Sequence, residues 1–511
     1  MDHGRLVRGA LQVNEVAVEL EDVRVVFGSN VALDGVTVRV RPRTIHALVG
    51  ENGAGKTTLM RVLYGAQRPE KGAIKLNGDP IEFHDSAQAI AAGVGMVSQH
   101  YAIIGELSCL DNLILGAEGS AVIDRGKARQ RAQELAERMG FDFQWDQLAS
   151  SLSPAGAQKL EILKLLWRQA RVMILDEPTA MLSPADSDAL FTSLHSLAQG
   201  GATIIVVTHR LPEVLEHCQD VSVLRGGKFV AAKAVADTNS AELAELIVGR
   251  SVDMSPRDRN KGAEVLLEAQ RLAVLGDRGN LAVKDASFEV RQGEIVGIAG
   301  VDGSGQRELM HCLLGVRAWS SGDLRWKGES LTGRGTKSRL AMGFRSIPED
   351  RHHEAVIEEW SLVDNALLGF QRRTEFAKNG WLDRPKVVES AIDFATKFAT
   401  KHDGVEKPIG GLSGGNQQRF VAGRAMGFEP ELVLAFQPAR GLDIAATQNV
   451  YEGMVEVCRR GGCALVVSFD LDELLQNCDR IIVMNRGKVF MPVPGRELNR
   501  SHIGELMVAT T

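Results

Sequence analysis

The chain has 511 residues, of which 44% are hydrophobic and 24% charged, a balance typical of a soluble protein with several domains. Its formal net charge of −6 gives no general attraction to nucleic acid, so we expect no nucleic-acid partner. The six cysteines form no C-x-x-C pair and no zinc spacing, and are therefore expected to be reduced thiols in a cytosolic protein.

The N-terminal segment is polar. Residues 1–14 include Asp2 and contain no apolar run, so they are predicted to form a tail and not a signal peptide. The longest apolar runs, such as 202–207, have the length of a strand and fall well short of the ~18 to 20 residues that a membrane span needs. If a membrane is involved, a partner must supply the spans.

A glycine-rich loop follows the first long apolar run. TIHALVG at 44–50 is predicted to be a strand, GENGAGKTT matches the pattern G-x-x-x-x-G-K-[ST], and TTLMRVLYG is predicted to continue as a helix. In such a loop the backbone N–H groups wrap a β-phosphate, Lys56 reaches the β and γ oxygens, and Thr57 offers its hydroxyl to Mg²⁺. The predicted ATP-binding residues of this loop are Gly50, Glu51, Asn52, Gly53, Ala54, Gly55, Lys56, Thr57 and Thr58.

Farther along, helical and strand patterns alternate. The stretch from about 100 to 170 has helical period and composition and predicts a helical subdomain, while VMIL and TIIVV are short buried strands. The core is therefore predicted to be α/β with a mostly parallel sheet. VMIL leads directly into Asp176, which is placed to hold Mg²⁺, and Glu177, which is placed to polarise the attacking water.

The second half of the chain repeats the first. GENGAGKTT corresponds to GVDGSGQRE at an offset of 250, and LDEPTAML, VVTHRLPEVLEHC and VLRGGK correspond to AFQPARGL, VVSFDLDELLQNC and VMNRGK at an offset of 260. The change in offset predicts one ten-residue insertion in the second copy, between about 350 and 411. The predicted organisation is a tail at 1–14, a domain at 15–249, a polar linker at 250–263 and a second domain at 264–511.

Together these motifs resemble the ATP-binding cassette (ABC) proteins that power membrane transporters. The resemblance rests on GENGAGKTT, Gln99 in MVSQHY, LSGGNQQR at 412–419, ILDEP and VVTHR, and it covers almost the entire chain in two tandem copies. It implies two P-loop ABC ATPase domains, each with a mostly parallel sheet and a helical subdomain. ATP and Mg²⁺ are the cofactors that it implies.

The resemblance also implies roles for single residues. Phe27 would stack on adenine, although an aromatic residue in a strand is equally expected in a core. Gln99 would sense Mg²⁺ and the water, and His209 would contact the γ-phosphate. The implied catalytic residues are Glu177, His209 and Gln99, the implied metal ligands are Thr57, Asp176 and Gln99, and the implied γ-phosphate contacts from the other domain are Ser413, Gly414 and Gly415.

The two copies lack different parts. In this family the signature of one cassette faces the P-loop of the other. The first copy has a complete P-loop but the signature LSPAG at 152–156, with Pro154 and Ala155 in place of two glycines. The second copy has LSGGN but deviates at six motif positions, namely Gln306, Arg307, Glu349, Phe436, Gln437 and Phe469. We therefore expect one competent composite site and one degenerate site that does not hydrolyse ATP; since Arg307 is still a cation, these residues leave nucleotide binding at the second site open.

Two fused cassettes with a degenerate second copy resemble the import ATPases for nucleosides and for monosaccharides. QHYAII, PEDRH at 348–352 and FQPARGLDIAA resemble the nucleoside branch, whose substrate-binding proteins are of the basic membrane lipoprotein type. The alternatives are an importer of ribose, xylose or galactose type and, less in keeping with the short linker, a soluble ribosome-associated tandem ATPase. The resemblance to import ATPases implies two integral-membrane permease subunits, an extracytoplasmic substrate-binding lipoprotein and a peripheral location at the cytoplasmic face of the membrane.

Overall fold

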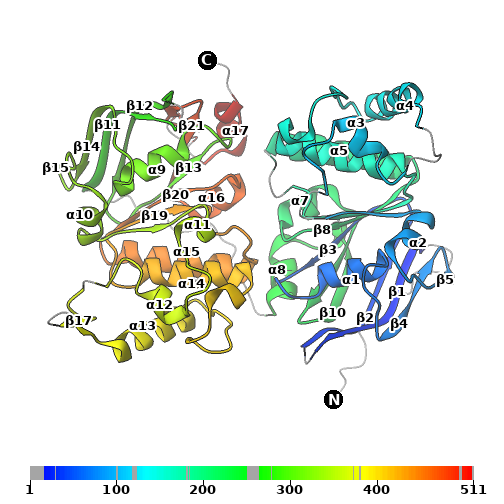
Figure 1. Ribbon diagram of the computed structural model, residues 1–511, viewed down its shortest axis with the longest axis horizontal. Helices are drawn as coiled ribbons and strands as arrows, with labels where there is room; N and C mark the ends of the chain where they lie inside the picture. The colour runs from blue at the N-terminus through cyan, green and yellow to red at the C-terminus, as the bar shows by residue number, and fades with distance from the viewer. Residues whose placement is uncertain are drawn as a thin grey trace. The chain divides into compact units, whose positions relative to one another are not determined.

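A computed structural model of the chain describes residues 16–28, 30–98, 102–117, 123–179, 182, 184–249, 264–277, 279–371, 373–378, 381–493, 496 and 498–508. The chain divides into two units, residues 1–253 and 254–511 (Figure 1). The division falls within the linker expected at 250–263, which, like the tail at 1–14, lies outside the described residues.

A six-stranded sheet, counted over the described residues, carries the first unit. Its spatial order is β10 (Lys228–Ala234), β9 (Asp220–Arg225), β3 (Ile45–Gly50), β8 (Thr203–Val207), β7 (Val172–Asp176) and β6 (Val94–Val97). The five strands from β9 to β6 run parallel, and β10 pairs antiparallel with β9. Every residue of β3, β7 and β8 is buried, which explains why these strands are continuous apolar runs in the sequence. The predicted mostly parallel core is confirmed.

An antiparallel sheet packs against the first helix of this unit and was not expected from the sequence. Its order is β2 (Asn30–Val40), β1 (Val18–Phe27), β4 (Lys71–Leu76) and β5 (Asp79–Ile81). It shares one apolar core with α1 (Lys56–Leu63), the helix that follows the glycine-rich loop. The remaining helices of the α/β core are α2 (Ser86–Ala91), α6 (Pro184–Gln199), α7 (Leu211–His217) and α8 (Ser240–Val248).

The predicted helical subdomain is present in the first unit. It consists of α3 (Cys109–Ile114), α4 (Arg125–Arg138) and α5 (Pro154–Trp167), which lie together in Figure 1. These helices have an apolar core of their own, which includes Leu113, Phe141 and Trp167. This core is separate from the one beneath α1, so the subdomain packs as a distinct layer.

The second unit repeats this architecture. Its larger sheet has the order β16 (Phe344–Ile347), β19 (Leu432–Phe436), β20 (Cys463–Val467), β13 (Ile295–Ala299), β21 (Arg480–Asn485) and β22 (Lys488–Phe490). Its antiparallel sheet has the order β12 (Leu281–Arg291), β11 (Val265–Leu275), β14 (Ser321–Trp326) and β15 (Glu329–Ser330). Its helices are α9 (Gln306–Leu314), α10 (Thr336–Ala341), α11 (Arg351–Glu354), α12 (Leu362–Ala366), α13 (Arg384–Lys397), α14 (Gly414–Met426), α15 (Ile444–Arg459), α16 (Leu471–Asn477) and α17 (Arg500–Val508).

The extra residues of the second copy lie in three places, and the expectation of one insertion was wrong. The capping residues of corresponding helices are 253 positions apart for α3 and α12 (108 and 361), 259 for α4 and α13 (124 and 383), and 260 for α5 and α14 (153 and 413). Strands β6 and β16 are still 250 apart. Three residues are therefore added around α11, and six more where the short hairpin of β17 (Ala377–Lys378) and β18 (Trp381–Leu382) has formed. One more is added between the capping residues of α13 and α14.

The fold bears on the expectations about membrane spans and about the cysteines. Within the described ranges, no helix has both the length and the apolar character that crossing a bilayer requires. All six cysteines are buried free thiols, including the repeat mates Cys218 and Cys478. Burial raises the pKa of Cys218 to about 12, as expected for an unreactive thiol packed in a core.

Candidate active site

The glycine-rich loop joins β3 to α1, as expected. Gly50 and Gly55 adopt φ of 156° and 96°, and a Cβ on Gly50 would lie 2.2 Å from the carbonyl oxygen of Leu224. Only glycine fits at Gly50 without moving the neighbouring strand. The ammonium of Lys56 is buried and donates to the carbonyls of Gly50 (2.7 Å) and Glu51 (3.0 Å). The lysine is thus held on the inner side of the loop to which a phosphate would bind.

Two of the expected metal ligands lie next to each other. The Thr57 hydroxyl donates to Oδ2 of Asp176 at 3.0 Å, although the two residues are 119 positions apart. Asp176 ends β7 and is 4% exposed, and this burial raises the pKa of its carboxyl above the ordinary value. A hydroxyl and a buried carboxylate are oxygen ligands of the type that Mg²⁺ takes, and a divalent cation would favour the ionised carboxylate. The residues present fit the expected metal.

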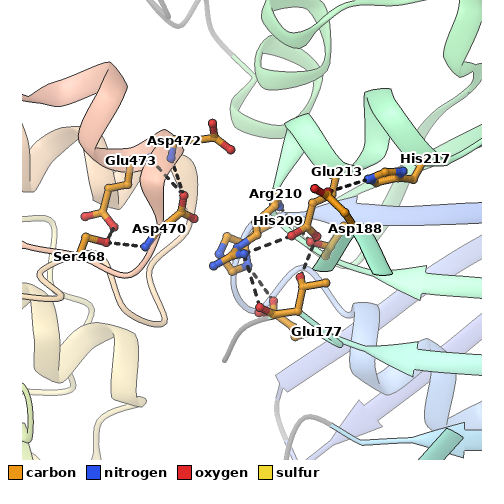
Figure 2. A network of polar contacts seen from close by, with 12 residues as sticks. Glu177, Asp188, His209, Arg210, Glu213, His217, Ser468, Asp470, Asp472 and Glu473 are labelled. Carbon is orange, nitrogen blue, oxygen red and sulfur yellow. Dashed lines mark hydrogen bonds and ion pairs between the residues drawn. The ribbon is translucent and has the colours of Figure 1, made fainter. Parts of the chain in front are cut away.

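Glu177 and His209 form a pair at the ends of β7 and β8. The imidazole Nδ1 of His209 lies 2.8 Å from Oε1 of Glu177 (Figure 2). Glu177 has a φ of 52°, a conformation that non-glycine residues rarely adopt, and its N–H donates to the carbonyl of Val207 at 2.8 Å. The backbone is therefore strained at the residue that carries the expected general base.

The contact between Glu177 and His209 also shifts the pKa of both side chains. Burial by itself raises the pKa of Glu177, but the hydrogen bond and charge of His209 outweigh it, so this carboxyl has a pKa below its ordinary value. Burial likewise lowers the pKa of His209, and the Glu177 carboxylate reverses this, so the imidazole has a pKa above 6.5. Glu177 is thus ionised at neutral pH, as a general base must be.

A second set of contacts connects the loops that hold this pair. The Thr179 hydroxyl donates to Oε2 of Glu213 at 2.8 Å, and Nη1 of Arg210 donates to Oε1 of the same carboxylate at 3.2 Å (Figure 2). Glu213 lies in the first turn of α7, and thereby joins the loop after β7 to the loop after β8. The repeat places Glu213 opposite Glu473, but no motif indicated this role from the sequence.

Phe27 and Gln99 are the remaining residues of the first unit that were expected at the site. Phe27 ends β1 and is 49% exposed, so it is not part of the core, and its contact with adenine stays a prediction. Gln99 lies outside the described residues, so the structure places neither its catalytic nor its metal-binding role.

The signature positions lie at the start of a helix in both units. Ser413 caps α14 and accepts from the N–H of Asn416 at 3.4 Å, while Ser153 caps α5 and accepts from the N–H of Gly156 at 3.1 Å. Pro154 occupies the first turn of α5, where its lack of an N–H costs the helix nothing. The missing N–H does remove a donor that α14 keeps at Gly414.

The second P-loop keeps the backbone turn of the first, and its two replaced side chains contact other residues of the same unit. Gln306, in the lysine position, is 2% exposed and its amide donates to the carbonyl of Val301 at 3.1 Å. Arg307, in the threonine position, donates to Oε1 of Glu354 at 3.2 Å, and its Nε lies 3.6 Å from Oε2 of Glu349. The cation that replaces the metal ligand is thus paired with two carboxylates of its own unit.

Aromatic residues take the metal and histidine positions of the second unit. The rings of Phe436 and Phe469, the counterparts of Asp176 and His209, are 5.9 Å apart and nearly perpendicular, at 89°. Gln437, the counterpart of Glu177, keeps the left-handed backbone with a φ of 47° and donates its N–H to Val467 at 2.7 Å. An edge-to-face aromatic pair offers no ligand to a cation such as Mg²⁺, so this position supplies no counterpart of the Asp176 carboxylate.

A parallel sheet that ends in a P-loop, a buried Asp next to the loop threonine and a Glu–His pair define a P-loop ATPase. The sequence profile of the ABC transporter family matches residues 33–180 and 283–439. The chain belongs to this family and is an ABC ATPase that binds ATP.

Relatives over the full length include two nucleoside import subunits. The nucleoside import ATP-binding protein NupA of Lactococcus lactis subsp. cremoris (strain MG1363) is 35% identical, and the guanosine import ATP-binding protein NupO of Bacillus subtilis (strain 168) is 36% identical. Each alignment covers 97% of this chain and 98% of the relative. The ribose import ATP-binding protein RbsA 1 of Rubrobacter xylanophilus (strain DSM 9941 / JCM 11954 / NBRC 16129 / PRD-1) is 34% identical over 96% of this chain and 98% of its own length.

A solved structure shares the tandem fold. A chain from the complex of the archaeal ribosomal stalk protein aP1 with the archaeal ribosome recycling factor aABCE1 matches with a TM-score of 0.67. The match covers 94% of this chain and 92% of that one, at 19% sequence identity. At that identity the likeness shows the fold and not the function.

Proposed function

We propose that the protein is the energy-coupling ATPase of an importer and that it hydrolyses ATP at one site, in the first unit. The observation that carries this is a set of five expected site residues at one edge of the first sheet. Lys56, Thr57, Asp176, Glu177 and His209 gather there from three separate segments, and the second unit lacks all five. Functional residues at the carboxyl ends of parallel strands are typical of α/β enzymes.

In the proposed mechanism these residues bind the phosphates, hold the metal or activate the attacking water. The loop N–H groups and Lys56 bind the β- and γ-phosphates, and Thr57 and Asp176 hold Mg²⁺, whose charge offsets that of the phosphates. Glu177 orients and polarises the attacking water, while His209 holds the Glu177 carboxylate and contacts the γ-phosphate. Gln99 reports on the metal and the water.

The second unit supplies the signature. We propose that Ser413, Gly414 and Gly415 complete the first site when ATP is bound, through their N–H groups and the serine hydroxyl. The first unit cannot return this contribution, because Pro154 lacks an N–H. One competent site and one degenerate site result.

The transported solute is proposed to be a nucleoside, as in the names of the NupA and NupO relatives. Two integral-membrane permease subunits and an extracytoplasmic substrate-binding lipoprotein complete the importer, with this protein bound at the cytoplasmic face of the membrane. The alternative is a monosaccharide importer, supported by the ribose import relatives at 32–34% identity. The ribosome-associated alternative is favoured by nothing beyond the tandem fold that the chain shares with the structure containing the archaeal ribosome recycling factor.

Replacing Glu177 by Gln tests the catalytic site. Because the amide cannot act as a general base, we expect the steady-state ATPase rate to fall by about 10²-fold or more while ATP still binds. The matched control is Gln437→Ala at the equivalent position of the second unit, which is expected to stay within about twofold of wild type. Substantial ATPase activity in Glu177→Gln would contradict the assignment.

Uptake measurements test the solute. A strain that lacks this ATPase is expected to lose uptake of labelled guanosine and uridine and to keep uptake of ribose, with rescue by the wild-type gene and not by Glu177→Gln. Loss of ribose uptake alone would assign the protein to the monosaccharide importers.

A further inference from the structure

Helix α11 lies between the second P-loop and the signature helix of the same unit. It is a single turn, Arg351–Glu354, capped by Asp350, whose side chain accepts from the N–H groups of His352 and His353. Its two end residues point their charged groups at different partners. Arg351 meets α14, and Glu354 meets α9.

The contact with the signature is close. Nε of Arg351 donates to Oε1 of Gln417 at 3.3 Å, and Gln417 is buried, 3% exposed, with its own amide donating to the carbonyl of Ile409 at 3.3 Å. A Cβ on Gly414 would lie 2.4 Å from Nη2 of Arg351. The guanidinium therefore takes the space next to the first signature glycine, and any side chain at Gly414 would displace it.

The other end of α11 reaches the second P-loop. Oε1 of Glu354 accepts from Nη2 of Arg307 at 3.2 Å, and its Oε2 lies 3.5 Å from Nε2 of His311. Arg307 and His311 are one turn apart on α9, the helix that begins at this loop. A phosphate or any other anion at the second P-loop would compete with Glu354 for Arg307.

The backbone that follows α11 is tied to the signature helix as well. Arg424 of α14 donates from Nη2 to the carbonyl of Ala355 at 2.7 Å and from Nη1 to the carbonyl of Asn365 at 2.9 Å. Ala355 belongs to the apolar core of the unit. One guanidinium therefore connects each end of α11 to α14, through Arg351 and Gln417 at 3.3 Å and through Arg424 and Ala355 at 2.7 Å, so a shift of α11 would be passed to α14.

This link has no counterpart among the described residues of the first unit. Ala157 stands where the second unit has Gln417, so the amide that Arg351 contacts is missing. Residues 102–104, the described part of the segment that corresponds to α11, are not helical. Within the described residues, the link is therefore found in the unit that has the intact LSGGN.

We infer that Arg351 is a positioning residue for the signature and that α11 relays the state of the second P-loop to it. Arg351 holds the turn at Ser413–Gly415 in the shape that closes on a γ-phosphate, and the Arg307–Glu354 pair makes this hold depend on the second P-loop. The inference rests on the proposed function, in which this signature completes the hydrolytic site. It gives the degenerate loop a role without hydrolysis.

Steady-state kinetics of the full chain test the first part. Arg351→Ala is expected to lower kcat about tenfold and to change the KM for MgATP by less than about threefold, because the signature acts after ATP has bound to the first P-loop. Arg351→Lys is expected to recover part of the loss. The matched control is Arg384→Ala, an exposed arginine of the same unit paired with Asp364 and Glu406, which should stay within about twofold. A kcat within about twofold of wild type in Arg351→Ala overturns the inference.

Hydrogen exchange tests the relay without using activity. Amides of residues 414–418 are expected to exchange at least about threefold faster in both Arg351→Ala and Glu354→Gln than in wild type or Arg384→Ala. The double variant should show the effect of Arg351→Ala alone, since both changes break one chain of contacts. Unchanged exchange in Glu354→Gln, or additive effects, overturns the relay. A Glu177→Gln chain measured in parallel reports on the proposed function separately, and the exchange result holds whichever site hydrolyses ATP.

Discussion

At the scale of single residues, the second copy has lost its chemistry and kept its backbone. Glu177 and Gln437 adopt nearly the same left-handed φ, 52° and 47°, and each donates its N–H to the neighbouring strand. Strain of this kind persists only where the surroundings fix the conformation. One oxygen of the side chain has become an amide nitrogen, and the turn that presents it is unchanged. At this position the two units therefore differ in the side chain and not in the backbone.

The Glu177–His209 pair predicts a pH-dependent contribution to stability. Since the pKa of His209 is raised above 6.5, the stabilisation from its protonated form is fully present below pH 6.5 and is lost as pH rises through the raised value. The lowered pKa of Glu177 acts in another window, because its contribution is lost only as pH falls below 4.5.

The measurement is the thermal midpoint of wild type minus that of His209→Gln. This difference is expected to shrink between about pH 6 and about pH 9. His84→Gln, which changes a histidine with a half-exposed side chain in the same unit, serves as the control and should show no such trend. A difference that grows with pH would show that Glu177 does not hold the proton on His209.

At the scale of elements, the glycine turns of both P-loops are requirements of the fold. Gly55 and Gly305 cap α1 and α9 with φ of 96° and 98°. A Cβ on Gly305 would lie 2.2 Å from the carbonyl oxygen of Ala282 in β12. The turn lets the helix start close against the antiparallel sheet, whether or not a phosphate binds. This explains why the second loop keeps its glycines after losing its lysine.

Gly305→Ala is accordingly predicted to destabilise the second unit. A left-handed φ and a backbone clash together should cost about 1–3 kcal/mol or more of unfolding free energy. In urea unfolding, the transition of the second unit is expected to shift to lower urea and that of the first unit to stay. Gly504→Ala, within α17 with open space around its Cβ, should be neutral or slightly stabilising. Equal stability of the two variants would mean that the turn is dispensable.

At the scale of the whole molecule, the two units carry different residues at their motif positions. The first has the buried carboxylates and the lysine, and the second has the signature and, in place of a metal site, the Phe436–Phe469 pair and an arginine already paired with carboxylates. Both keep a six-stranded and a four-stranded sheet of corresponding order. The asymmetry predicts a single metal-nucleotide site per chain.

Counting Mn²⁺ tests this asymmetry. In Glu177→Gln, which is expected to retain ATP, one Mn²⁺ per chain should remain bound with ATP after gel filtration, because only the first unit has ligands for the metal. Adding Asp176→Asn is expected to remove it, whereas Asp302→Asn, on the exposed part of the second P-loop, should leave it bound. Two Mn²⁺ per chain would contradict the assignment of a metal-free second site.

Much of the fold and of the candidate site was predictable from local sequence patterns. The order of strand, glycine loop and helix around Lys56 is set by residues adjacent in the chain, and so is the Asp–Glu step at the end of β7. Buried parallel strands are continuous apolar runs, so the sheet was predictable as well. The antiparallel sheet went unpredicted, because its strands contact one another and α1 through residues far apart in the sequence.

Motifs whose residues are close neighbours specify the chemistry that the chain contains, and the repeat shows which copy has lost which part. Which side chains meet is settled by the packing of distant segments. It paired Arg307 with Glu349 and Glu354, placed the rings of Phe436 and Phe469 edge to face, and set Arg351 against Gly414. The physical reason is that a backbone turn depends on local φ and ψ preferences, whereas an ion pair or ring contact depends on how distant segments pack.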